Sequence, residues 1–188
     1  MTFDAIPRGL EVLLLILVLT AALYDVRYRR IPNWLTAAGV LLGVGLNAFL
    51  TFDSVERWSG LMRSVEGLLI GFFAYLLLYL IRAMGAGDVK LMAAVGAIVG
   101  PRDWFGIFLI TAILGGIMAL ILVLVRKRLK KTLFNLSFIV DEMSHGRPAY
   151  MRNEELDVKS GKSVGLPHGA VIAVGTLFFL ALTSPFVR

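Results

Sequence analysis

Long runs of apolar residues, separated by short segments rich in charged residues, glycine or proline, constrain the fold of this chain more than any other feature. A helix crosses a hydrocarbon core about 30 Å thick with about 20 apolar residues. Six runs approach this pattern, at residues 9–24, 34–52, 65–81, 89–99, 104–125 and 164–186. With 58% hydrophobic residues and a mean hydropathy of +0.81, the chain differs from water-soluble globular proteins. The sequence predicts an all-α, polytopic integral membrane protein with about six transmembrane helices and a single membrane-embedded domain over residues 1–188.

The fourth run differs from the other five. Its uncharged stretch, residues 89–99, is too short to cross a bilayer by itself. We expect this helix to include residues 84–88, to tilt, or to be sheltered by the other helices.

The distribution of basic residues predicts the orientation in the membrane. Most of the 19 Lys and Arg residues follow the first, third and fifth runs. By the positive-inside rule these connections are cytoplasmic, and both termini face away from the cytoplasm. Topology thus accounts for the net charge of +6, and we expect no nucleic-acid partner.

The longest connection, residues 126–163, mixes basic residues with a group of apolar residues between positions 133 and 140. This pattern suits a cytoplasmic loop with an amphipathic helix on the membrane surface. Anionic lipid headgroups are the partner that its charge favours. Docking of a substrate is the alternative interpretation.

Two aspartates lie where ionisable residues are costly in a membrane protein and therefore indicate function. Asp25 follows the first run and Asp88 precedes the fourth, both on the predicted cytoplasmic side. Two carboxylates on neighbouring helices can converge on one water molecule. Held close together they do not both ionise, so one keeps a proton while the other acts as a base, as an aspartic protease requires. Gly85 and Gly87, which lack Cβ atoms, would let an extended peptide approach Asp88.

Structural interpretations of these acidic residues stay open at this point. Asp88 could be the N-cap of the fourth helix, and Asp25 could pair with Arg29 one turn away. Glu11 and Glu66 lie near the outer ends of their runs, where a carboxylate can reach interfacial water, and we interpret both as structural.

Three segments together resemble the type IV prepilin peptidases, which are aspartic proteases of the GxGD class, and in particular their short Flp/Tad-type form. Asp25 with the following Arg29-Arg30-Ile31-Pro32-Asn33 resembles the first aspartate motif of that family. Gly85-Ala86-Gly87-Asp88-Val89-Lys90-Leu91 resembles the second, and Leu166-Pro167-His168-Gly169-Ala170 resembles the motif that opens the last span.

The resemblance implies a peptidase that removes the basic leader from pilin-like precursor proteins at the cytoplasmic side of the bacterial inner membrane. By the same resemblance Asp25 and Asp88 are catalytic, while Gly85, Gly87 and Lys90 shape the active site. His168 stands where relatives often have an aromatic residue and is not assigned a catalytic role. The chain has no cysteine, so it lacks the paired cysteines of the larger bifunctional members. We therefore expect peptidase activity only, with no metal and no cofactor.

Two other classes of function remain as alternatives. Paired membrane carboxylates also relay protons in transporters, although the predicted spans offer few polar groups for a path across the bilayer. A non-catalytic component of a pilus or secretion system is the other alternative. A phosphate-binding loop at Gly161-Lys162-Ser163 is disfavoured, since Leu156 stands where that loop needs glycine.

Overall fold

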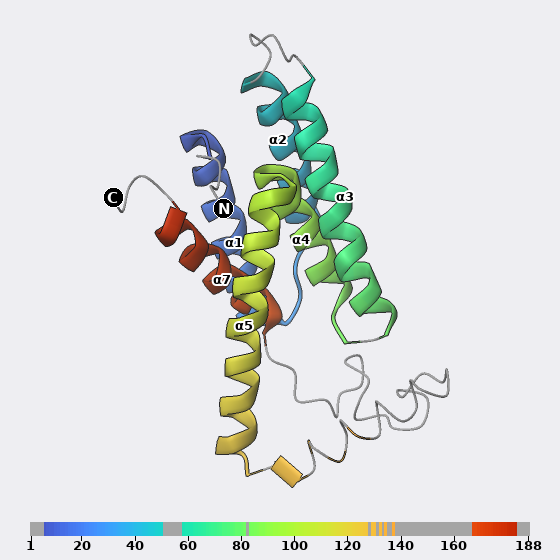
Figure 1. Cartoon of the computed structure of the whole chain (residues 1–188), viewed down its shortest axis with the longest axis vertical. Helices are drawn as coiled ribbons and strands as arrows, with labels where there is room; N and C mark the ends of the chain where they lie inside the picture. The colour runs from blue at the N-terminus through green and yellow to red at the C-terminus, as the bar shows by residue number, and fades with distance from the viewer. Residues whose placement is uncertain are drawn as a thin grey trace.

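The computed structural model describes residues 6–50, 58–81, 83–127 and 167–183, together with positions 129, 130, 132, 134 and 137. These residues form a bundle of six α-helices without a strand, which confirms the all-helical prediction (Figure 1). The helices are α1 (Arg8–Tyr28), α2 (Asn33–Leu50), α3 (Ser59–Leu80), α4 (Ala86–Val99), α5 (Pro101–Val125) and α7 (His168–Thr183).

Four of these helices are long and apolar enough to cross a membrane, namely α1, α2, α3 and α5. The other two, α4 and α7, have 14 and 16 residues and fall short of that length. The six expected helices are therefore present in order, but two of them do not span by length alone. Most of the expected surface helix and its loop, residues 126–163, lies outside the described residues.

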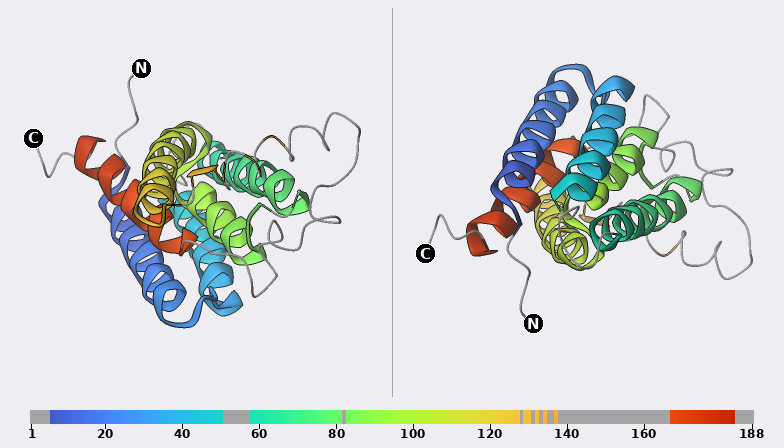
Figure 2. Two further views of the ribbon diagram at one scale, coloured as in Figure 1. Left: turned by 90° about the horizontal axis from the view of Figure 1, so that it is seen from below. Right: turned by 90° about the horizontal axis from the view of Figure 1, so that it is seen from above.

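The short helix α4 is enclosed by the rest of the bundle. It packs against α1, α2, α3, α5 and α7, and Figure 2 shows α2 and α3 flanking it. Every residue from Leu91 to Val99 is buried. A helix that is apolar on all sides is stable in such a position. The fourth run is thus sheltered, which was one of the three expected solutions, and it begins at Ala86 rather than at residue 89.

Glycines allow the neighbouring helices to approach α4 closely. A methyl group at Gly67 of α3 would overlap the carbonyl oxygen of Gly96, and one at Gly96 would overlap that of Gly67. On the other side, a methyl group at Gly43 of α2 would lie 2.8 Å from Cγ1 of Ile98. Small residues at such contacts are typical of helix pairs within membranes, where van der Waals packing drives association.

Polar side chains satisfy the carbonyl groups at the end of α4, which have no partner within the helix. Asn47 donates from Nδ2 to the carbonyl oxygens of Ala97 and Ile98, at 3.1 and 3.0 Å. Arg63 donates to the carbonyl of Val99 at 2.9 Å and to the fully buried carboxylate of Asp103 at 3.0 Å. The C-terminal end of α4 is thereby joined by hydrogen bonds to α2, α3 and α5.

The two outer carboxylates that we interpreted as structural have different environments. Glu66 is exposed, as expected, whereas Glu11 is only 6% exposed. Glu11 lies in the first turn of α1, where the positive end of the helix dipole stabilises a carboxylate.

Replacement of Gly67 or Gly96 by Ala is expected to destabilise the bundle, because the added methyl group overlaps the backbone of the facing helix. Overpacking of this kind lowers stability by about 1–3 kcal/mol, so the Tm of the purified protein in detergent should fall by about 2–12 °C. Gly45→Ala and Gly116→Ala are matched controls, since nothing lies within 4 Å of the added Cβ atom. Equal Tm values for all four variants would contradict the close packing of α3 on α4.

Candidate active site

Asp25 lies in the last turns of α1, because this helix continues to Tyr28 rather than ending near residue 24. Its carboxylate is 8% exposed and accepts a hydrogen bond at Oδ2 from the backbone N–H of Gly169, at 2.7 Å. Gly169 is the second residue of α7. The free N–H groups at a helix N-terminus favour a negative charge, so the start of α7 is a suitable support for this carboxylate.

Asp88 occupies the first turn of α4 and is 9% exposed. The backbone N–H of Gly85 donates to its Oδ2 at 3.2 Å, and the N–H of Asp88 donates to the carbonyl of Gly85 at 3.2 Å. The alternative prediction that Asp88 is the N-cap residue was therefore wrong, although Asp88 does help to cap the helix. The N-cap residue is Gly85, and Asp88 caps the helix from the third helical position.

The fold brings these two aspartates to the same end of the bundle. Helices α1 and α4 pack against each other, and the negative charge of Asp25 acts on the carboxyl group of Asp88 and on the side chain of His168. Among the described residues, one oxygen of each aspartate accepts a backbone hydrogen bond. The other oxygen of each carboxylate stays available to bind water or substrate.

Ile31, in the short connection between α1 and α2, contacts both glycine-containing segments of the site. A methyl group at Gly87 would lie 3.2 Å from Cβ of Ile31. A methyl group at Gly169 would lie 3.1 Å from Cδ1 of Ile31 and 3.1 Å from Oδ2 of Asp25. Gly87 and Gly169 therefore leave room for Ile31 between the starts of α4 and α7.

Gly85 has no comparable steric requirement in this structure. Its φ of −80° is accessible to any residue, and an added Cβ atom would make an ordinary contact of 3.4 Å with Oδ2 of Asp88. The expected role of Gly85 in admitting an extended peptide stays a prediction.

Lys90 binds to the start of α2. Its exposed side chain donates from Nζ to Oδ1 of Asn33 at 2.8 Å, which joins the start of α2 to α4. Residues two apart on a helix lie on different faces, so Lys90 and Asp88 are separated although they are close in sequence. Lys90 thus joins α4 to α2, and its expected role in shaping the active site stays a prediction.

Two contributors to this site were not assigned a role from sequence. The N–H of Gly169 and the side chain of Ile31 belong to the motifs described above, but their partners depend on how α7 and α1 pack. Within the described residues, no three His, Asp or Glu side chains are grouped to hold a metal ion.

Comparison with known proteins relates the region that contains both aspartates to a family of peptidases. The sequence model of the type IV leader peptidase family matches residues 12–120. A preflagellin peptidase of Methanocaldococcus jannaschii is 29% identical over 82 residues, which cover 44% of this chain and 34% of the relative. The chain thus matches about a third of the length of that curated relative. No solved structure matches the chain.

The hydrogen bonds to the two aspartates predict which replacements the fold tolerates. Asp25→Asn and Asp88→Asn should have nearly unchanged Tm values, because an amide oxygen still accepts from Gly169 or Gly85. Asp25→Leu should be clearly less stable, since a buried N–H left without an acceptor costs about 1–3 kcal/mol. Thermal unfolding in detergent measures the difference. An Asp25→Asn protein as unstable as Asp25→Leu would contradict this account of how Asp25 is held.

Proposed function

Because this chain belongs to the type IV leader peptidase family, we propose that it is a membrane aspartic endopeptidase. Its substrates are pilin-like precursors, of the type IV or Flp class, which lose a basic leader peptide at the cytoplasmic face of the bacterial inner membrane. Asp25 and Asp88 are the catalytic pair, and Gly85, Gly87 and Lys90 shape the site. No metal or cofactor takes part in the proposed reaction.

The observation that carries this proposal is the placement of Asp25 and Asp88 at the same end of the bundle. They belong to separate helices that pack against each other, and both are largely buried. The family match covers both positions. Two neighbouring carboxylates in a partly dry environment favour a state in which one is ionised and one is protonated, which is the starting state for hydrolysis by an aspartic protease.

The reaction needs only these two groups and one water molecule. The ionised carboxylate takes a proton from the water as the water oxygen bonds to the carbonyl carbon of the peptide. The protonated carboxyl group gives its proton to the carbonyl oxygen, which forms a tetrahedral gem-diol. When the C–N bond breaks, the leaving nitrogen receives a proton from the carboxyl group that gained one, and a gem-diol hydroxyl returns a proton to the other aspartate. The pair again holds one proton.

The predicted topology supports the proposed substrate. A precursor anchored by one helix, with its positively charged leader on the cytoplasmic side, presents its cleavage site at the end of the bundle that holds Asp25 and Asp88. The absence of cysteine from the sequence supports a peptidase without the methyltransferase activity of larger relatives.

Asp25→Asn and Asp88→Asn are each expected to abolish processing. Loss of the general base or general acid should lower the rate of cleavage by about a thousandfold or more. The test is co-expression with a candidate Flp-type precursor, with leader removal scored by gel shift and by mass. Glu66→Gln is the matched control, because it makes the same chemical change at an exposed carboxylate on α3.

The same experiment distinguishes the alternative functions. A scaffold would keep its assembly function when either aspartate becomes asparagine, provided the membrane level of the protein is normal. Cleavage that persists in either variant would remove that aspartate from the mechanism.

Gly169→Ala is expected to lower cleavage by about tenfold or more while changing stability little, because small displacements of a catalytic group are costly for rate. The added methyl group would lie 3.1 Å from Asp25 Oδ2, so the carboxylate must shift. The measurement compares kcat/KM with Tm. Gly116→Ala, where the methyl group meets nothing within 4 Å, is the control. Unchanged kcat/KM in Gly169→Ala would contradict a role for α7 in positioning Asp25.

A further inference from the structure

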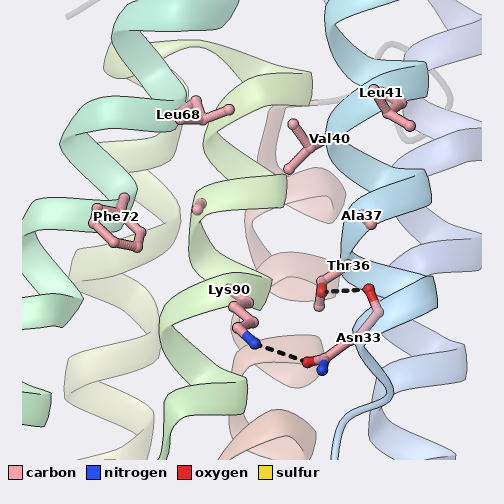
Figure 3. A pocket seen from close by; sticks show the side chains of 9 residues that line it. Asn33, Thr36, Ala37, Val40, Leu41, Leu68, Phe72 and Lys90 are labelled. Atoms are coloured by element: carbon pink, nitrogen blue, oxygen red, sulfur yellow. Dashed lines mark hydrogen bonds between the residues drawn. The ribbon is translucent and has the colours of Figure 1, made fainter.

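A groove lies between α2 and α3, with α4 as its floor (Figure 3). Its volume is about 550 Å³. Its lining is apolar apart from Asn33, Thr36 and Lys90, and its apolar residues include Ala37, Leu41 and Ala93. Because Lys90 and Asp88 lie on different faces of α4, this groove is separate from the site of the two aspartates.

The polar end of the groove carries an uncompensated positive charge. The ammonium group of Lys90 donates to the neutral Oδ1 of Asn33, and it forms no ion pair with a carboxylate among the described residues. Thr36 donates to the carbonyl of Asn33 at 3.1 Å, so the start of α2 is held in place at this end. Two donors of Lys90 and the amide NH₂ of Asn33 remain for an anionic acceptor. Figure 3 shows both side chains at one end of the groove, below the apolar wall.

The volume of the groove can be compared with the volumes of apolar groups that could bind in it. A helix about 10–12 Å wide with a rise of 5.4 Å per turn fills roughly 500 Å³ in a single turn. The volume of the groove corresponds to about one helical turn, and a single extended hydrocarbon chain can lie along it. Its walls belong to two helices that are apolar enough to cross the membrane, and Leu41 at its edge is 74% exposed. The groove thus opens toward the space that lipid occupies.

We propose that this groove is a binding site for an anionic phospholipid. One acyl chain lies between α2 and α3 over Ala93, and the headgroup phosphate accepts hydrogen bonds from Lys90 and Asn33. The polar end lies on the predicted cytoplasmic side, where the leaflet is rich in anionic lipid and basic pockets between helices bind such headgroups. This proposal does not depend on the peptidase function.

The test measures lipid selectivity directly. The full-length protein is reconstituted in phosphatidylcholine vesicles that contain a trace of spin-labelled phosphatidylglycerol or spin-labelled phosphatidylcholine, and the protein-bound fraction of each label is measured by electron paramagnetic resonance. The unmodified protein should prefer phosphatidylglycerol. Lys90→Gln should lower that preference by about fivefold, as expected for one lysine near a membrane surface. Lys90→Arg, which keeps the charge, should retain most of it.

A second variant tests the apolar part of the site. Ala37 is exposed on α2 and lines the groove, so Ala37→Phe should fill it and lower the bound fraction of phosphatidylglycerol without disturbing the core. The matched controls are Lys127→Gln and Ala112→Phe, which change an exposed lysine and an exposed alanine outside the groove. Selectivity that persists in Lys90→Gln, or that falls equally in Lys127→Gln, would overturn the proposal. Binding unaffected by Ala37→Phe would overturn the placement of the acyl chain.

Discussion

The rest of this structure depends on the enclosure of one short helix within the membrane bundle. With 14 residues at 1.5 Å each, α4 reaches only about two-thirds of the way across a hydrocarbon core. Backbone groups at its ends would be costly if they faced lipid, so the surrounding helices must cover them. Glycine at positions 67 and 96 lets the helices approach closely, and Asn47 and Arg63 satisfy the carbonyls at the C-terminal end. The other end of α4 carries Asp88 in its first turn.

Backbone groups hold both aspartates in place. Asp25 is bound by the start of α7 and Asp88 by the start of its own helix. A backbone N–H is fixed by the fold and contributes no titratable group, so it can orient a carboxylate without competing for its proton. The hydrogen bond requires the backbone of α7 to come close to the carboxylate of Asp25, which favours a small residue at Gly169. Conformational freedom does not explain this glycine, because Gly169 is helical.

Sequence alone predicts the parts of this molecule that depend on local hydropathy and charge. The order of the six helices, the short fourth helix and the membrane character follow from the lengths of the apolar runs. The family was identified from the residues around Asp25, Asp88 and Gly169, and the family match confirms that identification. The bond from Gly169 to Asp25 and the packing of Ile31 were not predictable, because they depend on how α7 lies against α1. The catalytic roles of the two aspartates stay predictions, supported by their proximity.

The first two turns of α4 carry residues of both the candidate active site and the groove. Asp88 lies in the first turn, while Lys90, on a different face of the helix, lines the groove between α2 and α3. Asn33, which accepts the hydrogen bond from Lys90, lies two residues after Ile31, which packs against Gly87 in the same turn of α4. The connection between α1 and α2 and the first residue of α2 therefore both contact α4 near its start. An anionic lipid bound at Lys90 and Asn33, as we propose, would bind where α2 and α4 are joined, two residues along α4 from Asp88.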